Sequence, residues 1–403
     1  MMIRFNIRDL YRYSILFLFF INLSFLNIYS NLTFTLQNLT CYLSIILFVI
    51  YLFQKRKVKI NFWILLSIGL IFLISLFNLY RGDAYFDNLI TFGNKIVLSR
   101  NLLFILLAFP INEVLASKES QKFLRWIFIL GMIAIVYRTF FWFLFNYMGI
   151  NLAPGLFEEK GLNWTRYGNV RLQGLFLDGY VIAYLSNQII QTKIYQKCYY
   201  LFLLAVVIFY EGYVYASRSQ FIAFLFMFFV LYIFHEKKSV TRLLDFIIVP
   251  IIIVAVFFSS YFERFADSFS VSNSNFGAGT QVRIIGQKYY QNLWLSNKLL
   301  GFGWSDDGNI FMGWKYYLSD LGIVRMLYQF GVIGFLIYLL PLLNSLLFGF
   351  KYRYRENGIL LLAVSFFTII SSFSSQNIYD YNRILLLPIL IALTNNVSMI
   401  KSK

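Results

Sequence analysis

Charged residues are scarce in this chain. Asp, Glu, Lys and Arg make up 13% of its 403 residues, while 60% are hydrophobic. A soluble domain carries about 25% charged residues, so this composition excludes a chain of soluble domains. Apolar runs of about 20 residues, the length needed to cross a bilayer, recur from end to end. The sequence therefore predicts an all-α polytopic membrane protein with a single integral membrane domain over residues 1–403.

Cysteine and histidine are rarer still, with two Cys and one His in the whole sequence. Cys41 and Cys198 fall at different depths of the predicted membrane spans, so no disulfide framework is implied. The histidine, His235, stands in the basic stretch "FHEKK" between two apolar runs. We expect no organic cofactor and no resident metal ion.

The apolar runs predict about twelve transmembrane helices. Their boundaries lie near 14–30, 36–53, 61–79, 96–114, 124–147, 172–190, 199–216, 219–234, 242–260, 319–347, 358–374 and 381–396. The sixth run, "LQGLFLDGYVIAYLSNQII", is the least apolar of the set.

The chain has 35 Lys and Arg against 18 Asp and Glu, a formal net charge of +17. Loops that stay in the cytoplasm are enriched in Lys and Arg. Placing the N-terminus inside and alternating across the spans puts more than half of the 35 basic residues in short inner segments. We therefore expect both termini in the cytoplasm of a multi-pass plasma-membrane protein, which in a Gram-negative cell is an inner-membrane protein. The positive charge then serves topology and attraction to anionic lipid, and nucleic acid is not an expected partner.

In this topology the two longest connections lie outside the cell membrane, at 148–171 and 261–318. Long loops in compact proteins are usually functional or disordered. The second loop contains "QVRIIGQKYYQNLWLSNKLLGFGW", a pattern that predicts a short amphipathic helix ending at glycines. We expect this large extracytoplasmic loop to be ordered and to lie at the membrane surface.

The basic residues of the expected outer half are mostly Arg, whereas the inner loops mix Lys and Arg. A guanidinium grips carboxylate or phosphate with two parallel hydrogen bonds. An Arg-rich outer face therefore predicts recognition of an anionic group. The candidates are Arg138, Arg171, Arg218, Arg264, Arg283 and Arg325.

Several of these polar residues have two interpretations. Arg138 and Glu211 fall inside expected spans, where they either pair to hold helices together or line a polar cavity open to the outside. Asp306, Asp307 and Asp320 are oxygen ligands for a hard cation, although loop acids of this kind are more often solvated. Asp320 by itself also fits a helix N-cap.

Four ordered segments within residues 171–335 together resemble the Wzy-type polysaccharide (O-antigen) polymerases and the related O-antigen ligases. The segments are "RLQGLFLDGYVIA" from Arg171, "SRS" at 217–219, "RIIGQKYYQNLWLSNKLLGFGW" from Arg283 and "SDLGIVRMLYQFGVIG" from Ser319. The resemblance implies a lipid-dependent glycosyltransferase that joins repeat units carried on polyprenyl (undecaprenyl) diphosphate, in lipopolysaccharide or other polysaccharide biosynthesis. The ligases carry a His where this chain has Asp320, which disfavours a His-dependent ligase. Ligation of a finished glycan to an acceptor stays open as the alternative.

The resemblance also implies roles for individual residues. Arg171, Arg218 and Arg283 stand at the level of the donor diphosphate and stabilise its growing negative charge. Asp320 takes the proton of the acceptor sugar hydroxyl as a general base. Four aromatic residues either stack on sugar rings or belong to an interfacial aromatic belt: Trp304, Trp314, Tyr316 and Tyr317. The implied partners are the lipid-linked glycan donor and acceptor, membrane lipids and a chain-length regulator.

A polysaccharide flippase or transporter is the remaining interpretation. It would spread intramembrane charges along many spans. The charges of this chain gather instead toward the expected outer face, which favours an enzyme.

Overall fold

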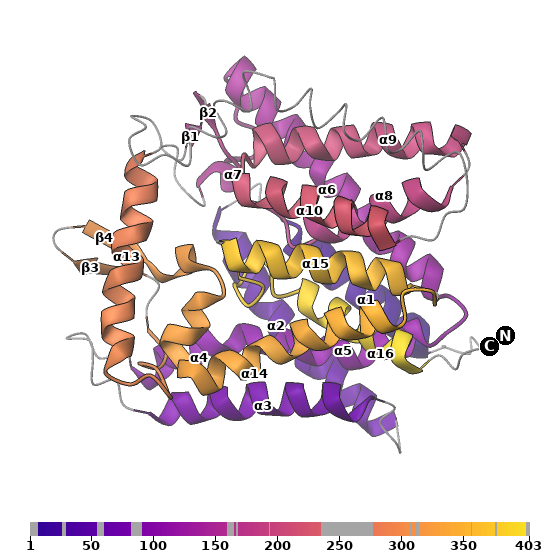
Figure 1. Cartoon of the computed structure of the whole chain (residues 1–403). Coiled ribbons are helices and arrows are strands. Elements are labelled where there is room, and N and C mark those ends of the chain that lie inside the picture. The colour runs from indigo at the N-terminus through magenta and orange to yellow at the C-terminus, as the bar shows by residue number, and fades with distance from the viewer. Residues whose placement is uncertain are drawn as a thin grey trace.

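The computed structural model describes residues 7–25, 30–54, 60–81, 91–158, 165–166, 168–192, 194–234, 277–305, 308–311, 314–355, 357–374 and 377–399. These residues form a bundle of helices with two short β-hairpins (Figure 1). The elements are α1 (Ile7–Asn22), α2 (Ser30–Gln54), α3 (Phe62–Tyr80), α4 (Phe92–Ser99), η1 (Arg100–Leu107), α5 (Ala108–Leu115), α6 (Ser120–Met148), α7 (Pro154–Glu158), β1 (Thr165–Arg166), β2 (Asn169–Val170), α8 (Asp178–Gln191), α9 (Ile194–Phe209), η2 (Tyr210–Val214), α10 (Arg218–Phe234), α13 (Gly277–Leu295), β3 (Gly308–Phe311), β4 (Trp314–Tyr317), η3 (Leu318–Leu321), α14 (Val324–Lys351), α15 (Gly358–Ser374) and α16 (Leu386–Met399).

Among the described residues, five helical stretches are long and apolar enough to cross a membrane, namely Phe62–Tyr80, Phe92–Leu115, Ser120–Met148, Tyr195–Val214 and Val324–Lys351. Shorter apolar helices accompany them at Asn38–Gln54, Gln220–Leu231, Gly358–Phe373 and Leu386–Met399. The predicted class, a helical membrane protein, is confirmed at this level. The number of twelve spans is not confirmed, and the expected span at 242–260 lies outside the described residues.

Two of the expected spans begin as helices later than the hydropathy indicated. α8 begins at Asp178 rather than near 172, and α16 begins at Leu386 rather than near 381. Each has 14 residues, which at 1.5 Å per residue is about 21 Å, shorter than a hydrocarbon core of about 30 Å. The residues before each helix are non-helical and mostly buried. Non-helical backbone at membrane depth is tolerated where protein covers it, so these two entry segments lie inside the bundle.

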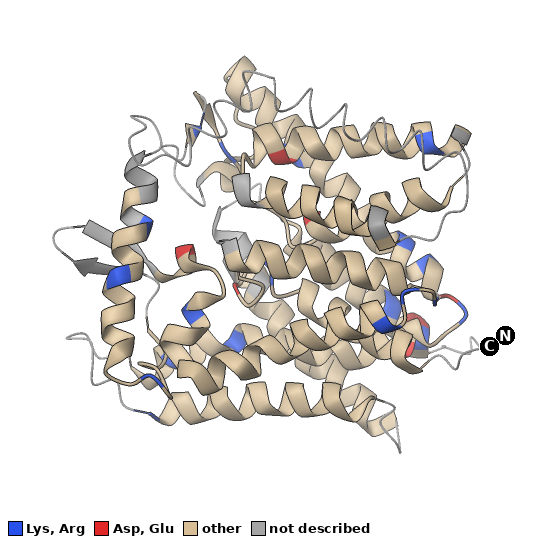
Figure 2. Cartoon of the chain, in the orientation of Figure 1, with Lys and Arg blue, Asp and Glu red and all other residues tan. Residues whose placement is uncertain are grey.

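The helices of the bundle run side by side, whereas α13 lies across one end of it, beside the β3–β4 hairpin (Figure 1). We call this the α13 end; the β1–β2 hairpin lies there too. The helix α14 begins at the α13 end, and after a break at Gly331 its last 20 residues extend about 30 Å away from that end. Its connection to α15, residues 352–357, therefore lies at the opposite end, which we call the α14–α15 end. Figure 2 shows Lys and Arg gathered toward these two ends of the bundle.

The amphipathic helix expected in the second long loop is α13, and its C-terminal side is tied to α14. α14 has a break at Gly331, where φ is 67° and ψ is −172°. The segment Lys298–Gly303 pairs with the backbone opened there, and Val332 N donates to the Lys298 carbonyl (3.0 Å). A Cβ at Gly331 would lie 2.2 Å from the Leu299 carbonyl carbon. Only glycine combines this positive φ with so close an approach. The contact between Lys298–Gly303 and Gly331, which we call the crossing, therefore fixes the end of α13 to the start of α14.

Candidate functional site

Two residues predicted for the site, Arg283 and Asp320, lie together at the α13 end. Arg283 is on α13 and Asp320 is in the turn η3, and Nη2 of the guanidinium is 4.0 Å from Oδ1 of the carboxylate. Their side chains are 48% and 42% exposed. Ion pairs this exposed contribute little to stability. The pair therefore contributes little to the stability of the fold, and both side chains are partly exposed to solvent.

The N-cap interpretation of Asp320 does not hold. The N-cap residue of α14 is Ile323, with no side-chain capping bond, and Asp320 lies before it as the third residue of η3. A capping carboxylate accepts from backbone N–H groups two or three residues into its own helix. The carboxylate of Asp320 instead faces Arg283 on another element.

Arg325 follows on the first turn of α14 but faces a different surface. Its Nη1 is 3.3 Å from Oδ1 of Asp380, and its Nε donates to Oε1 of Gln329 (2.9 Å). Both members of the ion pair are mostly buried, at 13% and 20% exposed. Gln329 also donates to Oγ of Ser305 (3.4 Å). Arg325 therefore holds α14 against the segment that enters α16.

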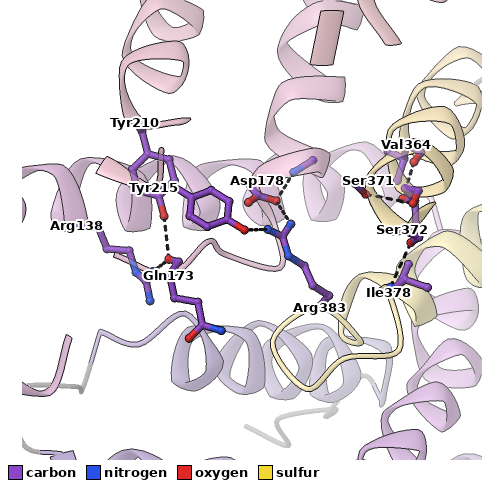
Figure 3. A network of polar contacts seen from close by, with 12 residues as sticks. Arg138, Gln173, Asp178, Tyr210, Tyr215, Val364, Ser371, Ser372, Ile378 and Arg383 are labelled. Carbon is purple, nitrogen blue, oxygen red and sulfur yellow. Dashed lines mark hydrogen bonds and ion pairs between the residues drawn. The ribbon is translucent and has the colours of Figure 1, made fainter. Parts of the chain in front are cut away.

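That entry segment, Asn377–Leu385, carries a second arginine into the middle of the bundle. Nη1 of Arg383 lies 2.6 Å from Oδ1 of Asp178, the first residue of α8, and Nη2 is 3.3 Å from the Tyr215 hydroxyl (Figure 3). Asp178 is fully buried and Arg383 is 8% exposed. Neither was predicted for the site. The available signal was that an acid or base inside an apolar span marks a functional site by default.

Arg138 and Glu211 belong to the same buried cluster. Arg138 and the Tyr210 hydroxyl both donate to the Gln173 carbonyl, the latter at 3.4 Å (Figure 3). Glu211 interacts electrostatically with Asp178 and with Arg383. Within the described residues it makes no direct ion pair with Arg138, and both of its carboxylate oxygens are buried without a hydrogen-bond partner.

This cluster contains two acidic and two basic side chains. The carboxylates are Asp178 and Glu211, and the guanidiniums are Arg138 and Arg383. Buried charges are tolerated only when they are compensated. Of the two interpretations of Arg138 and Glu211, the direct ion pair is not found, and Arg138 but not Glu211 is among the residues that line a small cavity.

This cavity has a volume of about 20 Å³, enough for one water molecule, and is lined by Arg138, Gln173, Gly174 and Tyr381 among others. Gly174 is required for the packing around it. A Cβ there would lie 2.6 Å from Nη2 of Arg383 and 2.6 Å from the ring of Tyr215. The glycine thus lets the backbone of the α8 entry segment pass directly against the ion pair.

The side chain of Arg171 contacts the turn that joins η2 to α10, which is distant in the sequence. Its Nη1 is 3.5 Å from the Ala216 carbonyl, to which Arg166 of β1 also donates. Arg218 is the first residue of α10, two positions after Ala216. The structure therefore brings Arg166 and Arg171 to the backbone of the turn that contains Arg218, although the side chain of Arg218 lies outside the description. Arg166 is an addition to the predicted set.

The remaining predicted residues are placed only in part. Trp304 is 5% exposed; its ring packs edge-on against Phe330 and its Nε1 is 3.4 Å from the Ser75 carbonyl. Its faces are therefore covered by protein in this structure and not presented to a sugar. The backbone of Trp314, Tyr316 and Tyr317 forms β4. Arg264, Asp306 and Asp307 lie outside the described residues.

The metal alternative gains no support from the part of the chain that the structure describes. No group of three or more His, Cys, Asp or Glu side chains able to hold a metal ion occurs there. Of the three acids considered, only Asp320 is described.

Comparison with known proteins yields no match: no protein-family model and no curated protein matches the chain. The function must therefore be argued from the geometry and from the sequence resemblance.

Proposed function

We propose that this protein polymerises lipid-linked oligosaccharide repeat units into a surface polysaccharide such as O-antigen. In this proposal the α13 end faces outward from the plasma membrane and the substrates are glycans on polyprenyl diphosphate. The observation that carries the proposal is the meeting of Arg283 and Asp320 at one end of an apolar bundle. The two residues are 37 positions apart, on separate elements, and the resemblance assigned one to the diphosphate and the other to proton removal.

The arrangement supports a displacement at the anomeric carbon of the donor. The acceptor hydroxyl forms the new glycosidic bond while the bond to the diphosphate breaks, and the electron pair of that bond leaves with the diphosphate. Arg283 stabilises the charge that develops there. Asp320 receives the hydroxyl proton. Holding both lipid-anchored substrates at one end of the bundle supplies proximity.

The contact between the two residues also suggests how the donor primes the base. The pair is 4.0 Å apart and half exposed, so it is weak. A diphosphate offers Arg283 a stronger, bidentate partner. Binding of the donor therefore draws the guanidinium of Arg283 away from Asp320 and removes a positive charge that opposes proton uptake by its carboxylate.

The test is extension of lipid-linked repeat units by the purified full-length protein. Asp320→Asn removes the base while keeping the shape, and we expect the rate to fall by roughly 10²–10⁴-fold. Arg283→Lys keeps the charge but loses the planar fork, and we expect weaker donor binding with shorter products. Lys288→Gln is the matched control, because it removes an exposed charge from the same helix and should extend normally.

The outcome also separates the alternatives. Near-normal extension by Asp320→Asn contradicts the proposed base. Transfer of a finished polymer to an acceptor without extension identifies a ligase. Translocation of the lipid-linked unit without a new glycosidic bond identifies a flippase.

A further inference from the structure

A second and larger pocket lies at the α14–α15 end, away from the site described above. Its volume is about 450 Å³, within the usual range of small-molecule sites. The start of α6, the last turns of α8 and the α14–α15 connection form its walls. Five carboxamide side chains line it, those of Gln121, Asn187, Gln188, Gln191 and Asn357.

The charged members of this pocket are Arg353 and Arg355. Nη1 of Arg355 donates to the Val397 carbonyl (2.9 Å), and its guanidinium stacks on the Tyr352 ring at 3.9 Å. Arg353 donates to the Phe350 carbonyl (3.2 Å) and to the Tyr354 hydroxyl (2.8 Å). These contacts hold both guanidiniums in place with neutral groups. A guanidinium has five N–H donors, so each retains donors for a ligand.

Two other arginines at the same end, Arg8 and Arg12, are paired with carboxylates. Arg8 pairs with Glu113 at 2.9 Å, and Arg12 pairs with Asp9 at 3.1 Å and with Glu119. Within the described residues Arg353 and Arg355 make no ion pair, and no carboxylate is among the residues that line the pocket. Two fixed positive charges, with no carboxylate among the described residues that line the pocket, predict an anionic ligand.

The carboxamides indicate what the anion carries. Gln191 donates to Asn187 (2.9 Å) and Gln121 donates to Asn357 (2.9 Å). Each accepting amide therefore has its oxygen engaged and presents its NH₂ group as a donor, while the side-chain oxygen of Gln191 can accept. Paired donors and acceptors of this kind suit hydroxyl groups, which both donate and accept.

We propose that this pocket binds a phosphate ester that carries hydroxyl groups, with Arg353 and Arg355 on the phosphate and the carboxamides on the hydroxyls. A phosphoglycerol group has this chemistry. It reaches the pocket either as the head group of a membrane lipid or as a soluble phosphorylated compound. This site is separate from the proposed catalytic end, so it stands or falls independently of the polymerase assignment.

The experiment measures binding to the purified full-length protein in detergent micelles, with phosphatidylglycerol as the lipid probe and glycerol 3-phosphate as the soluble probe. Phosphatidylcholine is the control lipid, because it has the phosphate without the free hydroxyls. Arg355→Gln should weaken binding about 10- to 100-fold, as expected for the loss of charge-assisted hydrogen bonds. Lys351→Gln is the matched control, because it removes one positive charge from the end of α14 but does not line the pocket.

A second variant guards against a folding artefact. Asn187→Asp has nearly the same shape and still accepts from Gln191, but it places a negative charge in the pocket. It should abolish phosphate binding, and circular dichroism without ligand should show the helical content of the wild type. Binding of the lipid probe alone assigns the lipid source, and binding of both probes assigns a soluble ligand as well. The proposal is overturned if neither probe binds, if phosphatidylcholine binds as well as phosphatidylglycerol, or if Arg355→Gln and Asn187→Asp bind like Lys351→Gln.

Discussion

The buried ion pair between Arg383 and Asp178 allows a quantitative test of the bundle. Its atoms are 2.6 Å apart and its side chains are 8% and 0% exposed. At an effective dielectric constant of about 20 the gross attraction is roughly 6 kcal/mol, most of which offsets the cost of removing the two charges from water. Removing one partner of such a pair leaves an uncompensated buried charge and costs about 3–5 kcal/mol.

The two single substitutions should not be equivalent, because Glu211 lies beside the pair and interacts with both members. Arg383→Gln leaves two buried carboxylates against the single charge of Arg138, and it should cost the full 3–5 kcal/mol. Asp178→Asn leaves Glu211 to compensate Arg383, so it should cost clearly less. The double variant should be more stable than the sum of the single losses implies, with a coupling energy of about 1–3 kcal/mol.

Reversible unfolding of the full chain in mixed micelles, followed by tryptophan fluorescence, measures these free energies, and Trp142 and Trp304 are buried reporters. Arg8→Gln is the matched control, since its ion pair with Glu113 is 48% exposed on the Arg side and should contribute less than about 1 kcal/mol. If Arg383→Gln costs no more than Arg8→Gln, or if the two single losses simply add, the cluster does not compensate charge as described.

Three further changes test other parts of the structure. Gly331→Ala should destabilise by about 1–3 kcal/mol or more from backbone strain alone, since φ there is 67°. Gly69→Ala, where a Cβ meets nothing within 4 Å, should instead be neutral or stabilising by up to about 1 kcal/mol, and a loss as large as that of Gly331→Ala would contradict the crossing. Gly174→Ala should cost about 1–3 kcal/mol by overpacking, because its Cβ meets Arg383 at 2.6 Å; a wild-type unfolding free energy would contradict that packing. In a background without the native cysteines, Asn297→Cys should react with a membrane-impermeant maleimide on intact cells or spheroplasts and Tyr354→Cys only after lysis, and the reverse pattern would overturn the orientation.

Hydropathy predicted the helices well where the apolar run and the helix coincide, as in α3, expected at 61–79 and found at Phe62–Tyr80. It misplaced the start of α8, because "LQGLFL" has the composition of a membrane helix. The contacts that keep this stretch non-helical come from residues distant in the sequence. The backbone of Leu172 donates to the Val214 carbonyl (2.9 Å), and Gly174 lies against Arg383. Such contacts are set by tertiary packing and leave no periodic signal in the sequence.

The same limit applies to the site. The resemblance selected Arg283 and Asp320 separately, and their contact across α13 and η3 emerged only in the structure. Asp178 and Arg383 were missed, because they are 205 positions apart and each occurs singly in an apolar stretch. The sequence shows that an isolated charge in an apolar stretch is energetically unfavourable, but it does not show which distant residue compensates that charge.

One short segment joins the two halves of the polar network. Asn377–Leu385 carries Asp380, which holds Arg325, and three residues later Arg383, which holds the buried cluster. The backbone N–H of Ile323, between η3 and α14, also donates to the carbonyl of Ser372 in the last turn of α15, five residues before this segment (2.7 Å). The end of α15 and the segment that follows it therefore contact the residues on either side of the start of α14, and through them fix the position of η3 and Asp320. A substitution at Arg383 should consequently disturb the α13 end as well as the core, so loss of activity in such a variant is no sign that Arg383 touches substrate.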